Sequence, residues 1–240
     1  MMIFLFVLGT IYGSFMYAQL KSKNVTSILF KRSKCEHCQS YLRWYDLIPI
    51  YSYINLQGKC RDCNNQIPID IFIVELMMGI LFTLPEFFVF SPTYIPLYYL
   101  IIVVLLPVAL IDALTLTIPL KSLILLTILS LFVIEITSAK LTFFICSAFL
   151  LHLFYVLFKE AIGYGDIILF SLLSFIFPNH LFIFILLFTF IIAGFYVVYI
   201  CFKQDNTILK IPLVPFILNA SILSIILNQD INTIIYGGIL

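Results

Sequence analysis

Two aspartates lie at the ends of apolar segments, where ionisable side chains are rare. Asp112 ends the apolar run Tyr94–Ile111, and Asp166 begins a second apolar run. If the two carboxyl groups converge they share one proton, because like charges a few ångströms apart cannot both ionise. The ionised member then takes a proton from water while the protonated member polarises a carbonyl group. The sequence therefore predicts a catalytic pair of aspartates from two different helices.

Two glycines accompany the second aspartate and indicate close backbone approach. Gly163 and Gly165 lie in the same short turn as Asp166, in the sequence Gly-Tyr-Gly-Asp. Glycine has no Cβ, so other groups approach its backbone closely and its dihedral angles are less restricted. We therefore expect these two glycines to let an extended substrate lie against the catalytic carboxylate.

Other ionisable residues offer weaker catalytic arrangements. The histidines show no recognisable pairing with a serine or cysteine, and a lone histidine in an apolar helix, such as His152, is typical of a satisfied core residue. Carboxylates near apolar segments are costly and so are functional candidates. Besides the two aspartates these are Glu75, Glu86, Glu135 and Glu160. For each one alone, an interfacial charge or a helix cap explains its presence equally well.

Two Cys-x-x-Cys pairs lie in one polar segment near the N-terminus. The four cysteines are Cys35, Cys38, Cys60 and Cys63. The gap between the pairs slightly exceeds the zinc-ribbon spacing of roughly 15–20 residues. Four thiolates complete a tetrahedral, structural zinc site. The alternatives are two disulfides or free thiols, and a reducing cytosol favours zinc. Cys146 and Cys201 lie in apolar runs and are expected to be packing residues.

The composition is that of a membrane protein. Of 240 residues, 63% are hydrophobic and 10% are charged, with a mean hydropathy of +1.15. Soluble domains are nearer half apolar and a quarter charged. A net charge of +1 argues against nucleic acid as a partner. The uncharged opening run lacks a basic start and a small-residue cleavage site, so we expect a retained helix and not a signal peptide.

The apolar runs predict an all-α, polytopic membrane helical bundle of about eight transmembrane helices, each near the length needed to span a bilayer. The predicted spans are Met1–Leu20, Ile71–Phe90, Tyr94–Ile111, Ile118–Ile136, Leu141–Phe158, Asp166–Phe177, Leu181–Phe202 and Ile211–Leu227. Prolines and glycines separate several of them. We expect residues 1–20 to form the first transmembrane helix, 21–70 a small tetracysteine loop and 71–240 a multi-helix membrane catalytic domain.

The basic residues predict the orientation, because lysine and arginine concentrate in cytoplasmic loops. Placing residues 21–70 in the cytoplasm puts every lysine and arginine except Lys140 on the cytoplasmic side. Both termini then face outward. Asp112 and Asp166, together with Glu75 and Glu160, fall at cytoplasmic helix ends.

Several motifs, taken in order, resemble the type IV prepilin peptidases, particularly the shorter competence-type members. They are Gly13-Ser14-Phe15; the Cys35–Cys38 and Cys60–Cys63 pairs flanking Leu42-Arg43-Trp44-Tyr45-Asp46-Leu47-Ile48-Pro49; Glu75 with Gly79; Asp112 six residues before Ile118-Pro119; Gly163–Asp166 after Glu160-Ala161; and Ile211-Pro212-Leu213-Val214-Pro215-Phe216. The Gly-x-Gly-Asp motif alone is weak, but the ordered set covers nearly the whole chain and is highly specific.

The resemblance implies two activities in the inner (cytoplasmic) membrane of a bacterium. The first is aspartic endopeptidase cleavage, by Asp112 and Asp166, of the basic leader of a prepilin or pseudopilin after a glycine, at the cytoplasmic face. The second is N-methylation of the new amino terminus with S-adenosylmethionine, associated with Glu75 and Gly79. We expect the lipid bilayer to hold the apolar part of the precursor, and Glu160 to attract its basic leader.

Two other functions remain open at this point. One is another Gly-x-Gly-Asp intramembrane aspartyl protease, of the presenilin or signal-peptide-peptidase kind, although those have no tetracysteine loop. The other is a non-enzymatic zinc-ribbon membrane assembly protein, which explains the cysteines but leaves Asp112 and Asp166 without a role. Close approach of these two carboxyl groups favours an enzyme.

Overall fold

The computed structural model describes residues 1–21, 32–88, 90–159, 161–203 and 210–228. The described chain is helical, apart from two isolated β-bridges that join Lys34 to Tyr41 and Lys59 to Gln66. It separates into two compact units, Met1–Val89 and Phe90–Leu240, which we describe individually. The structure thus groups the second predicted span with the first, whereas the sequence analysis grouped it with the later helices.

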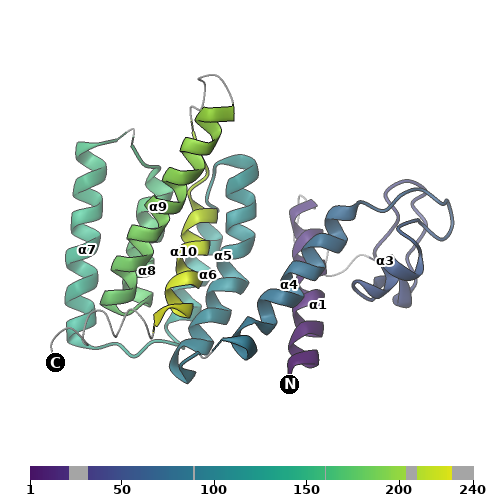
Figure 1. Cartoon of the computed structure of the whole chain (residues 1–240), viewed down its shortest axis with the longest axis horizontal. Helices are drawn as coiled ribbons and strands as arrows, with labels where there is room; N and C mark the ends of the chain where they lie inside the picture. The colour runs from purple at the N-terminus through teal and green to yellow at the C-terminus, as the bar shows by residue number, and fades with distance from the viewer. Residues whose placement is uncertain (22–31, 89, 160, 204–209, 229–240) are drawn as a thin grey trace. The chain divides into compact units, whose positions relative to one another are not determined.

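The first unit is a pair of helices that carries the cysteine loop. Helix α1 (Met2–Lys21) packs along α4 (Ile69–Phe87). In the chain, the segment that joins these two helices contains the short helices η1 (Trp44–Leu47) and α3 (Tyr51–Asn55). Figure 1 shows this loop beside the end of α4 at which that helix begins.

Glycines allow α1 and α4 to approach closely. A Cβ on Gly9 would collide with the backbone carbonyl oxygen of Met78. A Cβ on Gly79 would lie 2.6 Å from the ring of Phe6, and one on Gly13 would lie 3.0 Å from the Met78 Cβ. Small residues at such crossings let membrane helices associate through backbone contact. Gly79, expected to be associated with methyl transfer, therefore has a packing role inside the first unit.

The second unit is a helical bundle. Its elements are η2 (Pro92–Tyr94), α5 (Ile95–Thr115), α6 (Leu120–Ser130), α7 (Ser138–Leu157), α8 (Tyr164–Ile176), α9 (Asn179–Lys203) and α10 (Val214–Ile226). Helix α10 packs against both α5 and α9, and α7 packs against α8 (Figure 1). Tyr98, Ile101, Ile102 and Leu105 of α5 are fully or almost fully buried.

The breaks between these helices follow the residues that predicted them. Leu116 caps α5 in the left-handed conformation, with φ 54°. Pro119 and Gly163 are the N-cap residues of α6 and α8. Proline and glycine favour these positions because they interrupt helical hydrogen bonding or permit unusual dihedrals.

The all-helical prediction is confirmed, and each predicted span corresponds to a helix. Within the described residues, four helices are long and apolar enough to cross a membrane: α1, η2 with α5, α7 and α9. Helices α6, α8 and α10 are apolar but shorter, and α4 carries Asp70, Glu75 and Glu86. The eight spans and the orientation of the termini stay predictions.

The close packing at Gly9 predicts that two glycine-to-alanine substitutions differ in their effect on stability. We expect Gly9→Ala to destabilise the protein by about 1–3 kcal/mol, the usual cost of overpacking, because the opposing atom is backbone and cannot rotate away. Gly194→Ala in α9 is the matched control, since a Cβ there meets nothing within 4 Å. Thermal unfolding of the detergent-solubilised protein measures both. Equal stability of the two variants would contradict the packing.

Candidate functional site

Asp112 lies in the last turns of α5 and is buried. Its Oδ2 accepts a hydrogen bond from the backbone N–H of Val214 at 3.1 Å, and Leu213 also donates a backbone hydrogen bond to this carboxyl group. Val214 is the first residue of α10 and Leu213 is its N-cap, so these N–H groups have no partner within the helix. The Asp112 carboxylate therefore caps α10, at the helix end where negative charge is stabilised.

Asp166 lies in the first turn of α8, in a different environment. Gly163 is the N-cap residue, and its backbone N–H donates to the Asp166 carboxyl group, which is half of a capping box. The Oδ1 atom of Asp166 is buried, and among the described residues it has no hydrogen-bond partner. An unpartnered buried oxygen is costly in a folded protein and is a common feature of a catalytic group.

The two aspartates interact across the second unit, and their role as a catalytic pair stays a prediction. Their carboxyl groups are close enough to interact electrostatically. Ile118, in the connection between α5 and α6, packs against Gly165: a Cβ on Gly165 would lie 3.3 Å from the Ile118 Cδ1 atom. Gly165 thus lets the segment after Asp112 pack directly on the start of α8.

The two glycines of the turn serve the aspartate itself. A Cβ on Gly163 would lie 2.9 Å from Asp166 Oδ2, although the φ of −64° at Gly163 suits any residue. Glycine at this position leaves room for the carboxylate, and Gly165 leaves room for Ile118. Contact of either glycine with a substrate stays a prediction. Glu160, the predicted leader contact, lies outside the described residues.

The four loop cysteines form one cluster. Their Sγ atoms all lie within 4.8 Å of one another, with Cys35 to Cys63 at 3.9 Å and Cys38 to Cys60 at 4.0 Å. Four sulfurs about 2.3 Å from a tetrahedral zinc would be about 3.8 Å apart. None of the four is in a disulfide. The cluster therefore fits a metal ion, and the disulfide alternative is not observed.

The two cysteine pairs adopt the same turn. The N–H of Cys35 donates to Ser40 O at 3.0 Å, and the N–H of Cys60 donates to Asn65 O at 2.8 Å. In each case the residue after the second cysteine is left-handed: Gln39 has φ 59° and Asn64 has φ 57°. Ser40 also bonds Cys38 and lowers the pKa of its thiol to about 6, which favours the ligating thiolate.

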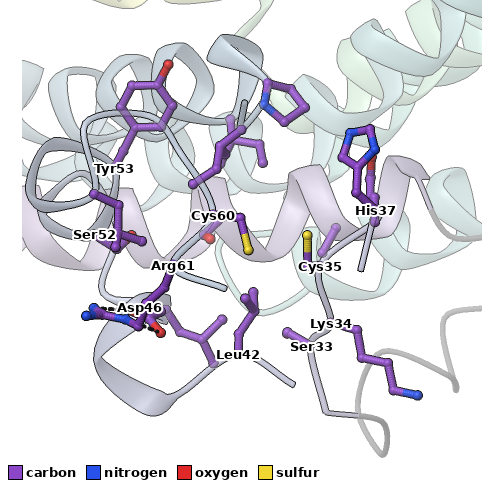
Figure 2. A pocket seen from close by; sticks show the side chains of 18 of the residues that line it. Ser33, Lys34, Cys35, His37, Leu42, Asp46, Ser52, Tyr53, Cys60 and Arg61 are labelled. Carbon is purple, nitrogen blue, oxygen red and sulfur yellow. Dashed lines mark hydrogen bonds and ion pairs between the residues drawn. The ribbon is translucent and has the colours of Figure 1, made fainter. Parts of the chain in front are cut away.

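Glu75 connects the cysteine loop to both helices of the first unit. Its Oε2 accepts the backbone N–H of Ile50 at 2.7 Å, and Ser14 on α1 also hydrogen-bonds this carboxyl group. Ile50 has a left-handed φ of 61°, so the bond holds a strained turn. Glu75 belongs to the lining of a cavity of about 490 Å³, which also includes Tyr17 and Tyr53. Figure 2 shows this cavity, with the Arg61–Asp46 ion pair at its edge.

The remaining cysteines lie outside the four-cysteine cluster, whereas His152 contacts the turn that carries Asp166. His152 Nδ1 is 2.8 Å from the Ala148 carbonyl oxygen and its ring contacts Tyr164. The histidine therefore has a hydrogen-bond partner, but it is not a core residue as expected, because α7 has no buried residue. Cys146 and Cys201 are exposed on α7 and α9, so the expectation that they pack inside the protein is wrong. An apolar run does not specify which face of a helix is buried.

Fold and sites together define a helical protein with long apolar helices, two interacting aspartates of which Asp112 is buried, and a four-cysteine cluster with the geometry of metal ligands. The sequence profile of the bacterial peptidase A24 N-terminal domain matches residues 7–88, and that of the type IV leader peptidase family matches residues 99–198. Each match lies within one of the two structural units. The chain belongs to the type IV prepilin leader peptidase family.

Curated relatives agree with this assignment. The chain is 40% identical over 81 residues to the prepilin leader peptidase/N-methyltransferase of Myxococcus xanthus, covering 33% of this chain and 24% of the relative. Over 62 residues it is 42% identical to the Vibrio cholerae protein, covering 26% of this chain and 24% of the relative. Over 83 residues it is 37% identical to the Bacillus subtilis protein, covering 34% of each. The chain thus aligns with a quarter to a third of the length of these relatives, and no solved structure matches it.

The metal site predicts a specific pattern of metal content. We expect about one zinc ion per purified chain, and we expect Cys60→Ser to lose it and to loosen the loop, because metal-binding energy here is folding energy. Cys146→Ser is the matched control, since Cys146 is outside the cluster. Elemental analysis with limited proteolysis measures both effects. Full zinc content in Cys60→Ser would contradict the site.

Proposed function

We propose that this protein is an aspartic endopeptidase that cleaves the leader of type IV prepilins or competence pseudopilins at the cytoplasmic face of the membrane. The observation that carries the proposal is the electrostatic interaction between Asp112, in the last turns of α5, and Asp166, in the first turn of α8. A non-enzymatic zinc-ribbon protein gives no account of a buried Asp112 carboxyl group that interacts with a second carboxyl group. The family assignment supports the same conclusion.

The surroundings of the two aspartates favour different roles. Asp112 accepts backbone hydrogen bonds at the start of α10, which stabilise its ionised form. Asp166 has a buried oxygen without a partner among the described residues, and a protonated carboxyl group is less costly there. Asp112 is therefore the base, and Asp166 holds the proton that the pair shares.

The reaction follows from these roles. Asp112 takes a proton from a water molecule as the water oxygen bonds to the scissile carbonyl carbon, and Asp166 gives its proton to the carbonyl oxygen. The tetrahedral diol then loses its C–N bond. Asp112 passes its proton to the departing amine, and a diol hydroxyl returns a proton to Asp166. The products are the free leader carboxyl group and a new amino terminus, and the pair is restored.

The second proposed activity is methylation of that amino terminus. S-adenosylmethionine supplies the methyl group as a sulfonium cation. The cavity in the first unit, about 490 Å³, is within the range of small-molecule sites. Its lining combines tyrosine rings, which attract cations, with side chains of both charges. Tyr17, Tyr53, Lys21 and Glu75 are the residues we expect to hold the methyl donor.

We propose zinc as the ion of the four-cysteine cluster and the bacterial cytoplasmic membrane as the location. Eight spans with both termini outside, and the cysteine loop with Asp112 and Asp166 inside, agree with the distribution of lysine and arginine. Zinc here has a structural role, because four thiolates leave no open coordination position.

The catalytic pair is tested by removing each charge while keeping its shape. We expect Asp112→Asn and Asp166→Asn each to reduce prepilin cleavage by at least about 1,000-fold, and the double variant to be no worse, because the two groups act as a unit. Cleavage of a precursor in membranes containing equal amounts of each variant measures this. Substantial cleavage by either single variant would reject the assignment.

Removing the Val214 N–H tests the assignment of Asp112 as the base and Asp166 as the group that holds the proton. We expect Val214→Pro, which removes this donor at a position that proline favours, to move the acidic limb of the pH–rate profile upward by roughly one pH unit, or about 1.4 kcal/mol. The basic limb, where Asp166 loses the shared proton, should stay in place. Val214→Ala keeps the N–H and is the control for lost packing.

A proline at residue 214 also restricts the backbone of Leu213, the residue before it. A backbone ester at residue 214 removes the same N–H without that restriction. Movement of the basic limb in place of the acidic one would assign the shared proton to Asp112. Apart from Asp166, no titratable group on the described residues faces Asp112: α10 carries none, and Lys121 on α6 and Lys203 on α9 are exposed.

A further inference from the structure

The cysteine loop exposes an unusual number of large apolar side chains. Trp44 is 76% exposed, Ile54 62% and Tyr51 57%. The full set within residues 41–54 is Tyr41, Trp44, Leu47, Ile48, Tyr51 and Ile54. Large apolar side chains exposed together in one short polar segment are typical of an interaction surface.

The one acidic side chain of the same segment turns inward, whereas Arg43 stays exposed. The Asp46 side chain is only 6% exposed, and it accepts Arg61 Nη2 at 2.7 Å. The Arg61 guanidinium also lies over the Tyr45 ring, 5.0 Å from its centre. A loop surrounded by water would reverse this arrangement, with carboxylates outside and tryptophan inside. The arrangement fits surroundings that are partly apolar.

Contacts with α1 and α4 show how far along these helices the segment reaches. Lys21 at the end of α1 pairs with Glu36 at 2.9 Å. Ile50 instead reaches Glu75, which also bonds Ser14 of α1. Ser14 lies seven residues before the end of α1, a distance of about 10 Å along a helix. The loop thus folds back along a helix that is long and apolar enough to span a membrane.

The neighbouring face of α4 continues the apolar surface. The Tyr53 ring of α3 packs on Phe72 in the second turn of α4, with centroids 5.1 Å apart. Ile69, Ile73 and Met77 on α4 are exposed. The contact between Tyr53 and Phe72 places the exposed apolar residues of the loop beside those at the start of α4. The same region of a lipid bilayer can therefore cover both.

We propose that residues 41–54 lie in the interface of the lipid bilayer, with Trp44 and Tyr51 at the level of the headgroups. Amphipathic aromatic rings favour this level. Exposed Lys34 and Arg43 beside the apolar residues complement anionic headgroups. The segment is a monotopic anchor that fixes the four-cysteine cluster against the membrane. This inference does not depend on the proposed peptidase activity.

The only tryptophan of the chain is Trp44, so the unmodified protein carries its own probe. The experiment reconstitutes the protein in vesicles of phosphatidylcholine and phosphatidylglycerol, with lipids brominated either near the headgroup or near the chain ends. We expect blue-shifted emission, stronger quenching by the bromines near the headgroup, and acrylamide quenching several-fold weaker than that of N-acetyltryptophanamide.

A second protein calibrates depth. Trp44→Phe with Phe149→Trp moves the probe to a residue of α7 that is 67% exposed and lies within a candidate span. Bromines near the chain ends should quench it more strongly than they quench Trp44.

Two results would overturn the proposal. Free quenching of Trp44 by acrylamide with no effect of brominated lipid would show a loop in water. Shielding of Trp44 from both quenchers, varying with protein density or with added prepilin, would show a protein partner on this surface.

Discussion

The arrangement of the second unit depends on one hydrogen-bonded contact, between the Asp112 carboxylate and the first backbone N–H groups of α10. A carboxylate among apolar helices is costly unless hydrogen bonds compensate it, and so are the free N–H groups at the start of a buried helix. The contact between Asp112 and Val214 satisfies both. It fixes α10 against α5 and orients the carboxyl group that Asp166 meets from α8.

In the first unit, too, a buried carboxylate accepts a hydrogen bond from a backbone N–H that is distant in the sequence, but there it positions a loop. Glu75 is buried on α4 and accepts the N–H of Ile50 from the cysteine loop. In both units a carboxylate on a helix holds a distant segment through a backbone donor. The outcome differs because Asp112 has a second carboxyl group beside it, whereas Glu75 has the Ser14 hydroxyl. The first arrangement suits proton transfer, and the second positions a loop.

Much of this was predictable from sequence, because the signals are local. Apolar runs between prolines and glycines located the helices, and the spacing of the cysteines located the metal site. The role of the Ile211–Phe216 motif was missed. Val214 acts through its backbone N–H, 102 residues from Asp112. Nearly every residue type has a backbone N–H, so the sequence does not indicate which one is the donor. The pairing of α4 with α1 was also missed, since hydropathy does not specify which helices pack together. The glycines at positions 9, 13 and 79 carried that information.

The central claim is that Asp112 and Asp166 share one proton, with Asp166 holding it. Infrared spectroscopy of the protein labelled with ¹³C-aspartate in its carboxyl groups observes this directly near neutral pH, because a protonated carboxyl group absorbs apart from carboxylates. The account predicts a protonated-aspartate band in the wild type that persists in Asp112→Asn and disappears in Asp166→Asn. A band that survives in Asp166→Asn and disappears in Asp112→Asn would contradict it.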